Sequence, residues 1–405
     1  MSVFTGVGVV APNGVGVKEF WAATLSGRSG IGELDRFDTS GQPARLAGLV
    51  RDLDPAQHLP SRLLPQTDVS TRLALIAAQS ALEDADLDTA SVTDYDMGVV
   101  TANASGGFEF THREFRKLWS QGSQHVSAYE SFAWFYAVNT GQISIRHGMR
   151  GPSCALVAEQ AGGLDALGQA RRSVRAGVPI MLSGGVDSAF DPWGWVSHLS
   201  SGRVSRDPDP ATAYRPFDRE ASGYVPGEGG AICVLEDAGS ARERGAHVYG
   251  ELAGYAATFD PAPGTGRPPG LRRAAELALA DAGIAAEEVD AVFADAAGLP
   301  ELDRAEALAL REVFGVRGAP VTAPKALTGR LFSGGGTLDV VAALMSIQDQ
   351  VIPPTFGTGT VPTDYGLDVV LGEPREARVD TALVLARGRW GFNAAAVIRT
   401  FQDRS

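Results

Sequence analysis

The chain has 405 residues, of which 44% are hydrophobic and 20% charged, a composition typical of a globular protein with a large core. Two cysteines are too few for a disulfide scaffold or a structural zinc site that needs several thiolates. The formal net charge of −13, without a long basic cluster, disfavours partners such as nucleic acid or an anionic membrane surface. No apolar stretch approaches about 18 residues and no signal peptide is recognisable, so we expect no membrane span and a cytoplasmic location.

The first half of the sequence alternates short apolar strands with helices. We expect strands over residues 3–10, 95–101, 155–158 and 179–185, and helices over 70–85, 107–119 and 161–176. Near the start, Gly6 and Gly8 form a GxG, but Pro12 follows where a dinucleotide site needs a helix. The sequence therefore disfavours dinucleotide binding.

The second half repeats this alternation after a polar helical stretch at 238–245, and we expect halves over residues 1–242 and 243–405. Its predicted helices cover 271–283, 302–314 and 338–348, and its predicted strands cover 289–294, 381–387 and 394–400. A glycine-rich segment at 329–336 precedes the last helix, and the acidic residues from Glu301 to Glu312 are expected to form a solvated helix face. Strands alternating with buried helices indicate α/β layers.

Residues 151–166 are the most informative segment, because a strand ends there, the chain bends and a helix begins with small residues. We expect Gln160 on the bend, where the free N–H groups and the dipole of the helix would stabilise an anion. A glutamine amide is not a nucleophile, because its nitrogen lone pair is delocalised. Gln160 can only donate and accept hydrogen bonds.

Five segments show a family resemblance that runs essentially from end to end. They are residues 5–12 (TGVGVVAP), 157–163 (VAEQAGG), 215–218 (RPFD), 223–229 (GYVPGEG) and 391–393 (GFN). On these residues the chain resembles the β-ketoacyl synthase branch of the thiolase-like family, and more narrowly the chain length factors (KSβ subunits) of bacterial type II aromatic polyketide synthases. The resemblance implies an α/β fold, the thiolase-like five-layered α-β-α-β-α sandwich made of two similar halves.

The resemblance also implies that all three groups of the Cys-His-His condensing triad are replaced. Gln160 stands at the cysteine, Asp295 at the first histidine and Arg330 at the second, while Lys325 matches the lysine of the family. An arginine does not act as a base near neutral pH, and a carboxylate at position 295 would repel a malonyl anion. We therefore expect no condensing activity.

Two interpretations of Gln160 stay open. In the first, it is a structural residue whose buried amide satisfies groups of the helix end and the neighbouring loop. In the second, the chain is a malonyl-ACP decarboxylase that supplies the acetyl starter, with the Gln160 amide stabilising an enolate. The absence of a condensing triad does not decide between a non-catalytic subunit and this enzyme.

The predicted helix at 107–119 carries the other functional hypothesis. Phe108, Thr111 and Phe115 are spaced i, i+3 and i+7, so they share one face. The spacing alone favours an ordinary core stripe. In chain length factors, however, this helix lies at the heterodimer interface and closes the polyketide tunnel, so the resemblance implies a chain-length gate with an octaketide-sized tunnel.

The resemblance finally implies the partners. We expect a heterodimer with a catalytic ketosynthase subunit (KSα), and an acyl carrier protein that docks mainly on KSα. The polyketide intermediate would occupy the shared tunnel. We expect no cofactor or metal bound to this chain, since the substrates are carried on the phosphopantetheine of the carrier protein.

Overall fold

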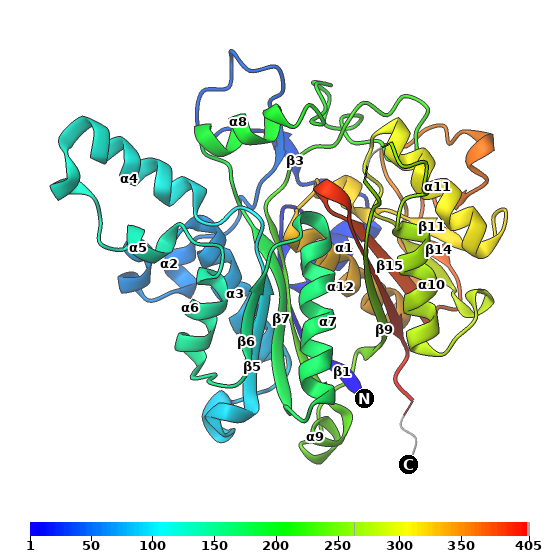
Figure 1. Ribbon diagram of the computed structural model, residues 1–405, viewed down its shortest axis with the longest axis horizontal. Coiled ribbons are helices and arrows are strands. Elements are labelled where there is room, and N and C mark those ends of the chain that lie inside the picture. Colours follow the sequence, from blue (N-terminus) through cyan, green and yellow to red (C-terminus); the bar gives the residue numbers. More distant parts are fainter. Residues whose placement is uncertain (263, 403–405) are drawn as a thin grey trace.

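The computed structural model describes residues 1–262 and 264–402, and ten of its strands form two groups of five; Figure 1 shows their arrangement. The first group comprises β1 (Ser2–Ala11), β5 (Met97–Ala102), β6 (Ser153–Leu156), β7 (Ile180–Asp187) and β8 (Gly229–Asp237). The second group comprises β9 (Gly250–Phe259), β10 (Ala291–Phe293), β11 (Pro320–Thr322), β15 (Thr381–Arg387) and β16 (Phe392–Arg399), with β13 (Asp368–Val369) at its edge.

The two groups have the same topology. In the order β6-β5-β7-β8-β1, the first three strands are parallel and the last two run antiparallel to their neighbours. The order β11-β10-β15-β16-β9 repeats this pattern strand for strand. Only two residue pairs, between β1 and β9, join the groups into one continuous sheet path. The predicted boundary between residues 242 and 243 falls at the end of α9 (Ala238–Glu243) and stays a prediction.

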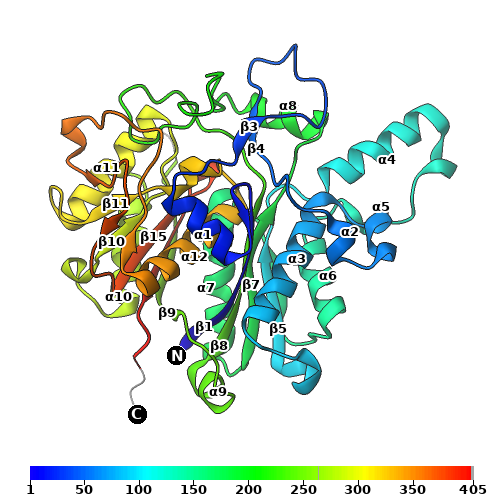
Figure 2. The ribbon, with the colours of Figure 1, turned by 180° about the vertical axis from the view of Figure 1, so that it is seen from behind.

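Helices form three layers around the two sheets. The outer face of the first sheet is covered by α3 (Val69–Asp84) and α6 (Val138–His147), and that of the second by α10 (Leu271–Ala282) and α11 (Pro300–Phe314). Between the sheets lie α7 (Gly162–Arg175) and α12 (Ser333–Asp349), which touch each other and strands of both groups (Figure 2). This is the five-layered thiolase-like sandwich that the resemblance implied, and the prediction of the fold is confirmed.

The middle layer explains one difference from the predicted elements. We expected a glycine-rich segment and then a helix from residue 338, whereas α12 begins at Ser333 and contains three successive glycines. Each of these glycines faces other atoms so closely that a Cβ would overlap them: Gly334 meets β8, Gly335 meets Gln160 and Gly336 meets Leu164. Burial between two sheets thus overrides the low helix propensity of glycine.

Three further helices form a projecting part of the first half. They are α4 (Phe108–Gln121), α5 (Glu130–Ala133) and α8 (Pro192–Ser200), with α4 reaching out from the body (Figure 1). The expected helix at 107–119 is therefore present, but much of its surface has no partner within the described residues. None of the described helices is long and apolar enough to cross a membrane.

Candidate functional site

The bend between β6 and α7 is held by a one-turn 3₁₀ helix, Glu159–Ala161. The residue with a positive φ is Glu159, with φ 50°, directly before Gln160, which we expected on the bend. The Glu159 carboxylate accepts hydrogen bonds from the backbone N–H of Gln160 (2.8 Å) and of Arg389 (3.0 Å). These bonds to the anion stabilise a backbone conformation that is unfavourable for a residue with a side chain.

The Gln160 side chain is fully buried and packs over the first turn of α12, where Gly335 leaves room for its amide. Neither Nε2 nor Oε1 has a hydrogen-bond partner among the described residues. The expectation that this amide satisfies the helix end and the loop is therefore wrong. An unsatisfied buried amide costs about 1–3 kcal/mol, so the site retains hydrogen-bonding capacity that the fold does not use.

Asp295 and Arg330, the residues at the two histidine positions, form a buried ion pair. The Arg330 Nη2 lies 3.0 Å from Asp295 Oδ1, and both side chains are at most 5% exposed. Asp295 Oδ1 also accepts a hydrogen bond from the backbone N–H of Arg387 (2.8 Å), and Arg330 Nη2 donates to the Arg387 carbonyl (2.5 Å). The pair thereby links the chain after β10, the start of α12 and the end of β15.

The Arg330 guanidinium keeps its charge in this environment. Burial lowers its pKa, but the charge of Asp295, followed by that of Glu159, raises it further, and the net shift is upward. The guanidinium also lies over the Tyr224 ring, 5.7 Å from the centroid. Arg330 is therefore a fixed cation and cannot exchange protons with a substrate.

Lys325, the lysine shared with the family, is buried as well. Its Nζ donates to the Ala294 carbonyl and pairs with the Asp339 carboxylate at 2.7 Å. Burial raises the pKa of Asp339 to about 6, against the lowering effect of Lys325. The single positive charge of this lysine is therefore paired within the protein.

We expected the acidic face of α11 to be solvated, but the carboxylates of two of its residues, Asp303 and Glu306, are buried. Glu306 accepts from the backbone N–H groups of Asp295 (2.7 Å) and Ala296 (2.8 Å), and Asp303 accepts from those of Phe217 (2.8 Å) and Gly298 (3.0 Å). Burial raises the pKa of each to about 7, and the charge of Asp295 contributes further to Glu306. These side chains fix the loop that carries Asp295.

Two adjoining cavities lie beside the bend. The smaller, about 90 Å³, is lined by the Asp295–Arg330 pair together with Glu159, Arg387 and Trp390. The larger, about 310 Å³, extends from Glu159 and Trp390 past Phe332 to Phe108 on α4. Around the smaller one the structure brings together the segments that the sequence analysis singled out separately, and the larger one connects them to the predicted gate.

The predicted gate contains an aromatic residue that the sequence analysis missed. Phe108 and Phe115 both pack on Trp193 of α8, with ring centroids 4.9 and 6.2 Å apart. Thr111 is buried, while the two phenylalanines are only partly buried. In the sequence, the Asp191–Pro192 pair directly before Trp193 is typical of a helix N-terminus and could have indicated this residue.

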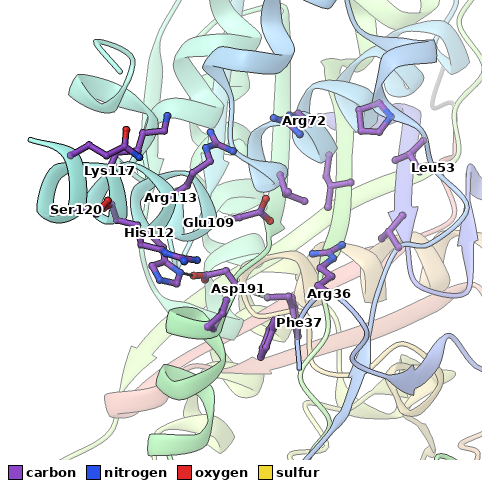
Figure 3. Close-up of a pocket in the computed structure, with 18 residues that line it drawn as sticks. Arg36, Phe37, Leu53, Arg72, Glu109, His112, Arg113, Lys117, Ser120 and Asp191 are labelled. Atoms are coloured by element: carbon purple, nitrogen blue, oxygen red, sulfur yellow. Dashed lines mark hydrogen bonds and ion pairs between the residues drawn. The ribbon is translucent and has the colours of Figure 1, made fainter. Parts of the chain in front are cut away.

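A third cavity of about 760 Å³ lies between α4, α3 and the segment around residues 36–55, and Figure 3 shows its side chains. It gathers five cationic side chains, namely Arg36, Arg72, Arg113, Arg116 and Lys117. Arg36 pairs with the buried Glu228, and Lys117 pairs with Glu114 at 2.8 Å. Arg116 has no ion-pair partner within the part of the chain that the structure describes.

The described residues contain no group of three or more metal-ligating side chains that could hold a metal ion. The two cysteines lack the features of a reactive thiol. Cys233 is completely buried, and burial raises its pKa well above the usual range; burial also raises that of the partly buried Cys154. Neither cysteine has the electropositive surroundings of a reactive thiol.

Comparison with known proteins places this site in a family. The family model for the N-terminal domain of β-ketoacyl synthases matches residues 3–241, and that for the C-terminal domain matches residues 249–358. The chain belongs to the β-ketoacyl synthase family. It is 68% identical over 403 residues to the actinorhodin polyketide β-ketoacyl synthase 2 of Streptomyces coelicolor, covering 99% of both chains.

Two solved structures of this family are similar over 99% of both chains. One is the ishigamide ketosynthase/chain length factor, at a TM-score of 0.91 and 29% identity. The other is a type II polyketide synthase acyl carrier protein in complex with its ketosynthase bound to the hexaketide, at a TM-score of 0.87 and 27% identity. As a β-ketoacyl synthase family member, the chain combines the fold of this family with a buried Asp295–Arg330 ion pair.

The Asp295–Arg330 pair leads to a stability prediction. In Arg330→Met the Asp295 carboxylate stays buried without its partner, and the free energy of unfolding should fall by about 3–5 kcal/mol. Denaturant-induced unfolding measures this change. The double variant Asp295→Asn/Arg330→Met keeps an acceptor for the Arg387 N–H without a charge and should recover most of the loss; an equally unstable double variant would contradict this account.

Proposed function

We propose that this chain is the chain length factor (KSβ) of a type II polyketide synthase, the non-condensing partner of a catalytic ketosynthase subunit in aromatic polyketide biosynthesis. The buried Asp295–Arg330 ion pair carries the proposal, because each residue neutralises the other where condensation needs two proton-exchanging imidazoles. A fixed cation, a paired carboxylate and an amide stand at the three positions that the resemblance assigns to the condensing triad, so none of them can act as its nucleophile or its base. The chain would instead complete the polyketide tunnel and stabilise its partner.

The proposed heterodimer is supported by an open sheet edge. β6 is the terminal strand of the first sheet, so one side of its backbone is free to pair with a strand of another subunit. Exposed apolar side chains surround this edge: Trp134, Phe135, Tyr136, Ile145 and Val157, each at least 38% exposed. An exposed apolar surface of this kind marks a protein interface. We assign it to the KSα subunit, which has the same fold.

The gate assignment is supported by the position of Phe108 at one end of the 310 Å³ cavity. Phe108, Phe115 and Trp193 form an aromatic cluster across α4 and α8, and Thr111 fills the buried side of α4 beside it. Bulky side chains at the end of a tunnel limit the length of the chain that fits. We propose that this cluster sets an octaketide-sized product.

Enlarging the gate should lengthen the product. Phe108→Ala and Phe115→Ala remove ring volume from the cluster, and Trp193→Ala removes the ring on which both phenylalanines pack. We expect each variant to raise the fraction of products longer than the native one several-fold, measured by mass spectrometry of the reconstituted synthase. Trp119→Ala is a matched control, because Trp119 belongs to the same helix and contacts Phe115 but is itself 77% exposed. Unchanged lengths in all three gate variants would refute the assignment.

One observation favours the second candidate function, malonyl-ACP decarboxylation. Both polar atoms of the Gln160 amide are free, and an N–H of this amide would donate to the enolate oxygen that forms as the malonyl C–C bond breaks and CO₂ leaves. Against it stands the complete burial of Gln160, which lines neither of the two cavities beside the bend. We therefore keep it as the alternative.

Gln160→Ala in the complex discriminates between the two functions. If the chain supplies the starter by decarboxylation, priming from malonyl-ACP fails while elongation from an added acetyl starter continues. If the chain is non-catalytic, we expect unchanged priming, with at most a change in stability or assembly. Starter formation and elongation are measured separately, with acetyl-loaded and malonyl-loaded carrier protein.

The acyl carrier protein is the second proposed partner, and its phosphopantetheine carries the substrates, so this chain needs no cofactor of its own. The polyketide intermediate is the only other ligand we propose. The two free cysteines fit a cytoplasmic site of action, where thiols stay reduced.

We propose that carrier docking falls mainly on KSα, and the basic cavity on α4 allows a direct test. Arg116 is the natural choice, since it has no ion-pair partner among the described residues and reversing its charge breaks no internal pair. We expect Arg116→Glu to change the affinity of the heterodimer for malonyl-ACP by less than about two-fold, measured by titration at fixed ionic strength. Arg378→Glu on the opposite half of the chain serves as the control for net charge. A loss of ten-fold or more, about 1.4 kcal/mol, would place docking on this chain instead.

A further inference from the structure

A histidine lies on the gate face of α4, between the two phenylalanines. His112 follows Phe108 by four residues and precedes Phe115 by three, so the three share one face of the helix. Its Nδ1 is bonded to the Asp191 carboxylate, and its ring lies 6.5 Å from that of Trp193, edge on. His112 is 25% exposed and Asp191 only 5%, so the bond is largely shielded from water.

Asp191 connects His112 to a second helix, α8. It is the N-cap of α8 and accepts hydrogen bonds from the backbone N–H groups of Trp193 (3.2 Å) and Gly194 (2.9 Å). One carboxylate therefore holds both the first turn of α8, which carries the Trp193 ring, and the side chain of His112 on α4. The bond therefore fixes the relative position of the two helices at the gate together with the ring contacts of Trp193 with Phe108 and Phe115.

The pair also lies on the boundary between two cavities. Phe108 and Gly194 line the 310 Å³ cavity that leads to the bend, whereas His112 and Asp191 line the basic 760 Å³ cavity (Figure 3). The wall between them is made by the contact of α4 with α8. Without the His112–Asp191 bond, only the aromatic contacts would hold this wall together on the side of the basic cavity.

We propose that His112 is a positioning residue of the chain-length gate, which through Asp191 fixes α4 against α8 and so sets the space between Phe108, Phe115 and Trp193. In this role His112 does not touch the growing chain; it acts through the Phe108 ring, which lines the 310 Å³ cavity, and the rings packed against it. The proposal rests on the proposed function as a chain length factor. The physical reason is that a site keeps its geometry only when the side chains that form it are themselves held by packing and hydrogen bonds.

The test compares two substitutions at one position in the reconstituted heterodimer. His112→Leu removes the donor and keeps an apolar side chain, whereas His112→Asn keeps an N–H donor near the place of Nδ1. We expect His112→Leu to raise the fraction of products longer than the native one several-fold, and His112→Asn to stay within about two-fold of the native distribution. His112→Ser, smaller and polar, should behave like His112→Leu and replaces it if that variant fails to assemble.

The readout separates positioning from simple stabilisation. Complex formation and the unfolding midpoint are measured for every variant, and a residue with only a structural role would change these and leave product length as it was. That result would overturn the proposal, provided that Phe108→Ala lengthens the product in the same assay. If Phe108→Ala also leaves the length unchanged, the gate assignment itself fails, and with it the role of His112.

Discussion

Two helices enclosed between two sheets are the constraint on which this structure depends. α7 and α12 touch each other at their N-terminal ends, where Gly163 and Gly336 leave no room for a Cβ between the helices. Gln160 lies directly before α7, and Arg330 directly before α12. The close contact of the helix starts therefore brings both positions to one place, and the duplicated topology supplies the enclosing sheets. Small residues at this contact are the condition for having a site here at all.

The enclosure between the two sheets buries the charged side chains of the site, and this burial determines their chemistry. A buried ion pair is costly to desolvate, and it persists when additional hydrogen bonds satisfy both partners. The Arg387 backbone supplies a donor and an acceptor to the Asp295–Arg330 pair, and Glu306 holds the loop of Asp295 by two backbone bonds. The result is a rigid network that exchanges no protons. Gln160, beside the start of α12, is a buried polar side chain that this network leaves without a hydrogen-bond partner among the described residues.

The projecting helix α4 presents three different surfaces. Phe110 and Glu114 face the body of the protein and are buried, Phe108 and Phe115 meet Trp193, and Arg113 and Arg116 line the basic cavity. A helix with one buried stripe and two functional stripes departs from ordinary amphipathic patterning. Its position then needs fixing from the side, which the N-cap of α8 provides. The proposed gate and the basic cavity are thus connected through one helix.

The sequence by itself determined the layered α/β fold and the positions of most central helices, and it predicted the loss of the condensing groups. These features are local: helical periodicity, a bend before small residues, and the replacement of three residues within recognisable segments. The prediction of a solvated face was wrong for Asp303 and Glu306, because only the i+4 spacing of Glu306 to the apolar Leu310 indicated their burial. The predicted start of α12 was too late, because glycine disfavours helices in isolation.

Only the tertiary structure decided which distant residues meet. Arg330 pairs with Asp295 across 35 residues of sequence, and Ser333 at the start of α12 donates to the Glu159 carbonyl across 174 residues. Trp193 likewise packs on α4 from a separate helix. No local pattern records such contacts, because they depend on how the two sheets and the helices between them are packed. The sequence thus determined what had been lost from the site, and the packing decided what stands there instead.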